Sequence, residues 1–187
     1  KEISISESYL RKKEDLHFNT ITPIEEFSNL EYVSLSGLYH LQEIKPLLKI
    51  KKIKNLNILG CDSVKDWEYI GGLINIEQLS INSRYFVQFE FINQLVNLKH
   101  VSFNNITLQT EKFSKIFLPL INLENISLSS FVFNGNEKFI IEVFSSKLKL
   151  KQLNLSDCNI SDFFFLSYLP NLEILVLRNT SISCIDN

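Results

Sequence analysis

Residues 169–182 read LPNLEILVLRNTSI, and the chain of 187 residues repeats this phrase with small changes. Close copies are EFSNLEYVSLSGL at 26–38, GGLINIEQLSINS at 71–83 and LPLINLENISLSS at 118–130. The copies share apolar residues at their first, fourth and sixth positions. Alignment on this pattern gives seven starting points: Leu30, Ile53, Ile76, Leu98, Leu123, Leu150 and Leu172. The spacings are 23, 23, 22, 25, 27 and 22 residues, which indicates one structural unit repeated along the chain.

We number each repeat from this first apolar residue. Apolar residues at positions four and six, such as Val33 and Leu35, alternate with polar ones and therefore share one face of a short strand. Between strands a second apolar series recurs at a spacing of three, as in Ile160, Phe163, Leu166, Leu169 and Leu172. This spacing fits a 3₁₀-like return with one buried face, so each repeat predicts a strand, a turn and a tight return.

Two returns, over 108–123 and 133–150, are longer than the others. They contain TEKFSKIF and NEKFIIEVFSSKL, with the helix-start residues Thr110 and Asn136 and with apolar residues three and four apart. We expect a short α-helix in each. The stretch EISIS at 2–6 predicts a further strand with Ile3 and Ile5 inward, followed by the charged segment RKKED.

The domain organisation follows from these patterns. We expect an N-terminal capping segment and partial repeat over residues 1–29, because a solenoid must cover the open end of its core. About seven repeats over 30–187 complete one continuous domain.

The segments IKPLLKIKKIKNLNIL and ITPIEEFSNLEYVSL resemble the 22-residue class of leucine-rich repeats found in bacterial internalins and in related intracellular phosphatase regulators. The resemblance extends from about Phe18 to the end. It implies an α/β solenoid with a parallel sheet on the concave face, 3₁₀ and short α-helical returns on the convex face, and a role in binding another protein. The family places Asn at position nine, where it bonds to backbone. Here only Cys61, Cys158 and Thr180 resemble accepted substitutes, so we expect less regular turns.

Position two carries charges whose sign alternates along the whole chain: Glu31, Lys54, Glu77, Lys99, Glu124, Lys151 and Glu173. Adjacent strands lie about 4.8 Å apart, so these residues are expected to be cross-strand neighbours. Opposite charges in register stabilise the pairing and penalise a slip. We interpret this series, the charge ladder, as structural.

Positions three, five and seven are expected to form the concave face, and almost all are uncharged hydrogen-bonding residues. Such a face is either a solvated sheet surface or a platform for a polar polypeptide. The candidate partner-binding residues are Tyr32, Asn55, Gln78, His100, Asn125, Gln152 and Arg178. Interface energy concentrates in a few large side chains, so Tyr32, His100 and Arg178 are the expected anchors.

A weaker candidate surface lies just past the strands. Tyr39 and Tyr85 share position ten, and Phe131 lies at position nine. These aromatic residues either form a contact surface along one edge or are covered by the long returns.

The sequence offers little chemistry for catalysis or for cofactor binding. None of the three histidines, at 17, 40 and 100, lies in a triad or metal-ligand spacing, so we expect no enzyme, no metal and no cofactor. Turnover dependent on His100 would be the contrary result. A net charge of −2 and a pI near 6.0 argue against nucleic acid as a partner. No apolar run approaches the roughly 20 residues that span a membrane.

The cysteines bear on the compartment. Cys61 and Cys158 occupy the same position four strands apart, about 19 Å, and so cannot form a disulfide. With Cys184 the number of cysteines is odd, and no signal peptide is visible, which favours a cytoplasmic setting. The chain begins at Lys1 and lacks Met, which indicates a trimmed start, so a secreted or cell-surface setting stays open.

The favoured function is a non-enzymatic protein-binding module. The alternatives are a surface or secreted adhesin-like protein of internalin type and a toxin-neutralising, immunity-type partner. Self-association through the C-terminal end is a further possibility, because the apolar residues Ile182 and Ile185 follow the last strand without a polar terminal repeat.

Overall fold

The computed structural model describes residues 1–6, 19–84 and 89–180. Tyr85, Ile182, Cys184 and Ile185 therefore lie outside the described residues, as does the charged segment RKKED. The chain divides into two compact units, residues 1–97 and residues 98–187.

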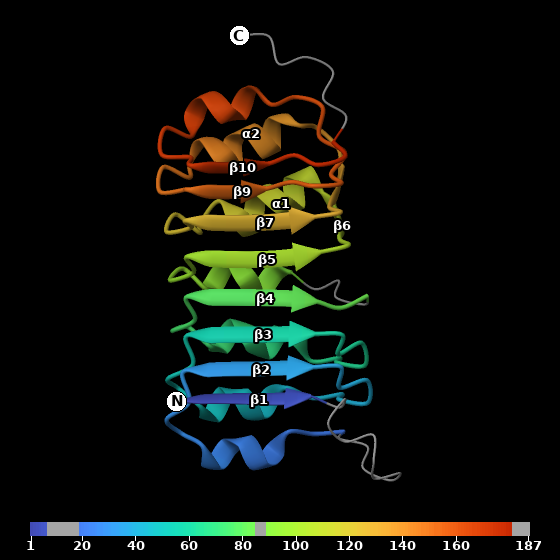
Figure 1. Cartoon of the computed structure of the whole chain (residues 1–187), viewed down its shortest axis with the longest axis vertical. Helices are drawn as coiled ribbons and strands as arrows, with labels where there is room; N and C mark the ends of the chain where they lie inside the picture. Colours follow the sequence, from blue (N-terminus) through green and yellow to red (C-terminus); the bar gives the residue numbers. More distant parts are fainter. Residues whose placement is uncertain (7–18, 85–88, 181–187) are drawn as a thin grey trace. The chain divides into compact units, whose positions relative to one another are not determined.

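The first unit contains a parallel sheet with the strand order β1-β2-β3-β4 (Figure 1). The strands are β1 (Glu2–Ser6), β2 (Tyr32–Ser36), β3 (Asn55–Leu59) and β4 (Gln78–Asn82). Tyr32 pairs with Asn55 and Asn55 with Gln78, which confirms the alignment of the repeats predicted from the sequence. Ile3 pairs with Val33, so the predicted strand at EISIS is also confirmed.

The returns of this unit are 3₁₀-helices on one face of the sheet (Figure 1). They are η2 (Thr22–Glu26), η3 (Lys45–Lys49), η4 (Trp67–Gly72) and η5 (Glu90–Gln94). Pro23 and Pro46 lie at the starts of η2 and η3, where the fixed φ of proline favours a helical turn and its missing N–H costs nothing.

The second unit contains a parallel sheet with the strand order β5-β7-β9-β10. Its strands are β5 (His100–Asn104), β7 (Asn125–Ser129), β9 (Gln152–Asn154) and β10 (Ile174–Val176). The returns are α1 (Thr110–Phe117), α2 (Lys138–Ser145) and the 3₁₀-helix η6 (Phe164–Tyr168). Both predicted α-helices are therefore present, and Oδ1 of Asn136 accepts the N–H of Lys138 at 2.9 Å.

The longer returns add a second, small sheet that the sequence did not predict. Strand β6 (Thr107–Gln109) pairs in parallel with β8 (Val132–Asn134), through Leu108 and Phe133 among others. The additional residues of these two repeats thus form a second ladder beside the helices.

The core of each unit lies between the sheet and its returns. Val33 and Leu35, at positions four and six, have no exposed surface. In the second unit phenylalanine fills this space, and the ring of Phe113 lies 4.5 Å from that of Phe117 and 6.1 Å from that of Phe131. Large apolar side chains removed from water supply most of the stabilising free energy of such a fold.

In the repeats of β2, β3, β5, β7, β9 and β10, position eight has positive φ: Gly37, Gly60, Asn105, Ser130, Asp157 and Asn179. The N–H of this residue donates to the position-seven carbonyl of the next repeat, as in Gly60 to Asn82 at 2.7 Å. At position nine, the thiol of Cys158 donates to the carbonyl of Leu128 at 2.8 Å, and the hydroxyl of Thr180 donates to that of Leu177. These two residues therefore bond to backbone, as the resemblance implied for position nine.

Candidate functional site

The open face of each sheet is formed by positions three, five and seven, whose side chains alternate with those of the core. In the first unit it brings together Tyr32, Asn55 and Gln78, which are neighbours in register on β2, β3 and β4. None of the three has a hydrogen bond to another described side chain. Their polar groups are therefore available to a partner.

Asn57 lies at the centre of this first-unit face, one row further along the strands, paired with Ser34 and Ser80. Its Oδ1 atom is buried and has no hydrogen-bond partner among the described residues. A buried acceptor without a donor costs about 1–3 kcal/mol. A ligand that brings a donor to this atom would recover that free energy.

The open face of the second unit is different, because its polar side chains bond to one another. Nδ2 of Asn125 donates to Oε1 of Gln152 at 2.9 Å. Asn154 donates to the hydroxyl of Ser129 at 3.2 Å, and its Oδ1 accepts the hydroxyl of Ser156 at 2.7 Å. Mutual satisfaction leaves this face with fewer groups for a partner.

His100 and Arg178 belong to the second unit but do not lie together. His100 is at position three, beside Asn125 on β7, whereas Arg178 is at position seven of the last repeat and is exposed. Four residues of strand, about 13 Å, separate these two positions. The predicted anchors thus lie at opposite ends of the strands.

The aromatic edge predicted from the sequence is only partly present. Tyr39 is 52% exposed, but Phe131 is fully buried between Phe113 and Phe133. The prediction of a partner-binding role for Phe131 is therefore wrong, because the long return containing α1 covers it. Tyr85 lies outside the described residues.

An asparagine ladder, which the sequence reading missed, holds the turns before the strands. The asparagine preceding position one reaches back one repeat, so that Asn75 donates to the carbonyl of Lys51 and Asn97 to that of Ile74, both at 2.9 Å. Where lysine replaces asparagine, as at Lys149, its ammonium donates to Oδ1 of the preceding asparagine, Asn122, at 2.7 Å. The signal was present in the repeated letters NL of the phrase itself.

The charge ladder forms ion pairs within each unit. Lys54 lies 3.5 Å from Glu31, and Lys151 lies 2.9 Å from Glu124. The hydrogen bond and charge of Lys151 lower the pKa of the Glu124 carboxyl, and the same bond raises the pKa of Lys151.

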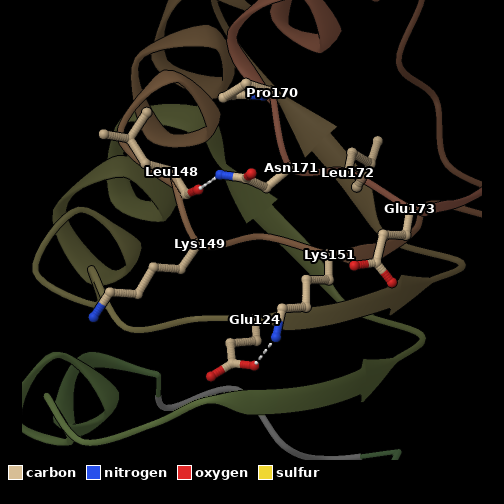
Figure 2. A pocket seen from close by; sticks show the side chains of 8 residues that line it. All are labelled: Glu124, Leu148, Lys149, Lys151, Pro170, Asn171, Leu172 and Glu173. Carbon is tan, nitrogen blue, oxygen red and sulfur yellow. Dashed lines mark hydrogen bonds and ion pairs between the residues drawn. The ribbon is translucent and has the colours of Figure 1, made fainter.

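In the second unit, a groove of about 570 Å³ is bordered by three residues of the charge ladder, Glu124, Lys151 and Glu173 (Figure 2). Leu148, Pro170 and Leu172 supply its apolar part, and Glu173 lines it beside Lys151. The groove combines apolar surface with charges of both signs, which suits a mixed polypeptide surface better than a single anion.

Lys147 is a second feature that the sequence reading missed. It occupies the place in the threefold series taken by Ile50 and Leu169 in other repeats, and it is fully buried. Its Nζ donates to Oγ of Ser146 at 2.8 Å and to the carbonyl of Leu118, just past the end of α1, at 3.3 Å. Burial without a carboxylate lowers the pKa of Lys147 to about 8.

The structure offers no further chemistry in its described part. Residues 1–6, 19–84 and 89–180 contain no group of three or more His, Cys, Asp or Glu side chains placed to bind a metal ion. Within the same ranges, every helix is too short or too polar to cross a membrane.

Comparison with known proteins identifies the fold. No family model and no curated protein sequence matches the chain. Among solved structures, internalin C2 of Listeria monocytogenes matches with a TM-score of 0.67 and 21% identity over 84% of this chain. Internalin F of the same organism matches with a TM-score of 0.57 and 19% identity over 86% of this chain. The chain spans 66% and 58% of the length of these two proteins.

The chain thus has the leucine-rich-repeat fold, in its internalin-like form, as the sequence predicted.

Proposed function

We propose that the chain is a non-enzymatic protein-binding module whose open sheet face contacts its partner, with the centre of the contact on the first unit. The observation that carries the proposal is the buried, unpaired Oδ1 of Asn57. Around it, Tyr32, Asn55 and Gln78 offer polar groups that have no hydrogen bond to another described side chain, on a regular sheet. A preformed surface of this kind binds with a low ordering cost.

The chemistry of this face favours an uncharged polar polypeptide segment as partner. Backbone N–H groups or hydroxyls would donate to Asn57, and Tyr32 would supply a rigid amphipathic anchor. The residues His100, Asn125, Gln152 and Arg178 are candidates for a partner contact on the second unit's own open face. The edge residue Tyr39 is a weaker candidate for the same role.

Affinity capture from lysate, followed by calorimetry with the purified captured protein, tests the proposal. Tyr32→Ala should weaken binding about thirtyfold and Asn57→Ala about tenfold. Asn93→Ala is the matched control, because Asn93 is exposed on η5, away from the open face. Binding that survives both face variants unchanged would contradict a first-unit centre.

The double variant His100→Ala with Arg178→Ala examines the second unit separately. Loss of binding in this variant alone would move the centre of the contact to the second unit. Retention in all open-face variants would move it to the Tyr39 edge. Turnover of any substrate that is lost in His100→Ala would contradict the non-enzymatic assignment.

A second candidate is a surface or secreted adhesin-like protein, which the likeness in fold to the two Listeria internalins favours. Such a protein should capture a component of foreign cells. A cytoplasmic regulatory protein should instead capture a partner from its own source, and an immunity-type partner should form a very tight one-to-one complex with a toxin. Capture from both lysates in parallel distinguishes these roles.

A further inference from the structure

The link between β8 and α2 contains the one Asn-Gly pair of the sequence, Asn134 and Gly135. Phe133, just before the pair, is held by the side-chain amide of Asn159. Oδ1 of this amide accepts the N–H of Phe133 at 2.7 Å, and its Nδ2 donates to the carbonyl of Phe133 at 3.0 Å. Just after the pair, Oδ1 of Asn136 accepts a backbone N–H at the start of α2. The pair therefore joins two anchored points of the second unit.

The pair itself is exposed and weakly held. Asn134 is the last residue of β8, and the structure exposes both it and Gly135. The side-chain amide of Asn134 has no hydrogen bond to another described residue, and the N–H of Gly135 has no acceptor among them. A segment with few hydrogen bonds and an exposed backbone opens locally at little cost in free energy. The side chain of Asn134 can therefore turn toward the N–H that follows it.

The fold requires glycine at the second residue of the pair. Gly135 has a φ of +121°, and a Cβ at this residue would lie 2.7 Å from Oγ1 of Thr110, the first residue of α1. Thr110 is 2% exposed, so it has little room to move away. The nitrogen of glycine is not shielded by a side chain. Most other asparagines of the chain precede leucine or isoleucine, as in Asn75 and Asn97 of the asparagine ladder.

We infer that Asn134 is a site of spontaneous deamidation in the folded chain. The backbone nitrogen of Gly135 loses its proton and attacks Cγ of Asn134. The new N–Cγ bond closes a succinimide ring, while the Cγ–Nδ2 bond breaks and Nδ2 leaves with a proton as ammonia. Water then opens the ring. It gives aspartate where it breaks the new N–Cγ bond and isoaspartate where it breaks the original backbone amide bond, and no group is oxidised or reduced.

The two products should act differently on the second unit. Each adds one negative charge to a chain with a net charge of −2. Asn134 is in register with Gln109, which directly precedes α1, and a carboxylate near a helix N-terminus is stabilising. Isoaspartate instead lengthens the backbone where Gly135 approaches Thr110, which should weaken the pairing of β8 with β6. The site lies off the open sheet face and is independent of the proposed function.

Incubation of the purified chain in warm, mildly alkaline buffer, followed by peptide mass spectrometry, tests this inference. Fragmentation locates the replacement of the amide NH₂ by a hydroxyl, and an isoaspartyl methyltransferase labels the isoaspartate product. Asn134 in the native chain should convert within about tenfold of its rate in the urea-unfolded chain, because local opening costs little. Asn136 is an internal control, since it is also exposed but precedes Glu137. It should convert at least about tenfold more slowly, because the next residue carries a side chain.

Two matched variants complete the test, with folding of both verified by circular dichroism. Asn134→Ser should abolish the labelling by the methyltransferase, and Asn136→Ser should leave it unchanged. A native chain that stays intact at Asn134 while the unfolded chain converts would show that the fold protects the pair, and this result would overturn the inference. Equal conversion at Asn134 and Asn136, or labelling that persists in Asn134→Ser, would overturn it as well.

Discussion

The Nδ2 atom of Asn171 donates a 2.7 Å hydrogen bond to the backbone carbonyl of Leu148, one repeat earlier in the chain. The same relationship joins Asn75 to Lys51 and Asn97 to Ile74. Side-chain amides thus tie successive turns together at the start of the strands. They do so in addition to the position-nine bonds of Cys158 and Thr180 to backbone carbonyls.

Replacing Asn75 by alanine should lower the free energy of unfolding by about 1 kcal/mol, the typical net value of one hydrogen bond. Urea unfolding followed by circular dichroism measures the change. The control is Asn93→Ala, which removes an exposed asparagine outside the ladder and should change stability by less than about 0.5 kcal/mol. Equal losses in the two variants would contradict a structural role for the ladder.

The buried Lys147 makes stability depend on pH. Its pKa is about 8 in the folded chain and about 10.4 in an unfolded one, so between these values the unfolded state binds more protons. Stability contributed at this residue therefore rises as the pH increases from 8 to 10. At pH 7 the buried ammonium costs the fold about 3 kcal/mol relative to the neutral amine.

Lys147→Met removes this titration. We expect the variant to be more stable than the wild type at pH 7 by about 1–2 kcal/mol, after the loss of two hydrogen bonds. The difference should shrink or reverse by pH 10, which paired urea titrations at both pH values would measure. A constant difference between the two proteins would show that Lys147 does not titrate in this range.

The residues at position eight have a left-handed backbone conformation, and they differ in the free-energy cost of carrying a side chain in that conformation. At Gly60, φ is +61°, and the atoms nearest to an added Cβ lie at 3.9 Å, so only the backbone conformation opposes a side chain. Gly60→Ala should cost about 1 kcal/mol, and Gly60→Asn less, because asparagine tolerates this conformation. Ser130→Gly, at φ 56°, should gain about 0.5–1 kcal/mol. Thermal unfolding of the three variants measures the order, and a stabilised Gly60→Ala chain would contradict it.

The two described cysteines should be chemically inert in the folded protein. Cys61 and Cys158 are buried, and burial raises the pKa of the Cys158 thiol to about 11, which leaves almost no thiolate at neutral pH. In a Cys184→Ser chain, neither remaining thiol should react with an aromatic disulfide reagent at pH 8 until denaturant is added. Fast reaction of either thiol in the native chain would contradict this placement.

The sequence predicted the strands, their register and the two α-helices because these depend on the spacing of apolar residues within each repeat. This spacing can be recognised in a short stretch of sequence. For Val33 and Leu35, alternation with polar residues is enough to predict that both side chains face inward. The pairing of Asn125 with Gln152 followed from counting positions across a return of unusual length.

What the sequence did not predict depends on contacts between repeats. Phe131 occupies a position where the family has a polar residue, and only the packing of α1 reveals that it is core. From its residue type alone, Lys147 would be predicted to lie on the surface. Only its alignment with Ile50 in the threefold apolar series indicates that it is buried. The difference between the two open faces is decided by side-chain hydrogen bonds such as that from Asn154 to Ser129, and residue type alone does not specify these.

Because the charge ladder alternates in sign, the stability of a shortened or lengthened chain depends on how many repeats are removed or added. Deletion of one repeat, residues 53–75, would place Glu31 beside Glu77, so that two like charges would lie next to each other in adjacent repeats. Deletion of two repeats, residues 53–97, would join Glu31 to Lys99 and preserve the pattern. Likewise, duplication of two repeats preserves the alternation of charge, whereas duplication of one repeat does not. A change in length by two repeats therefore keeps opposite charges side by side, whereas a change by one repeat costs about 0.2–1 kcal/mol at the new junction.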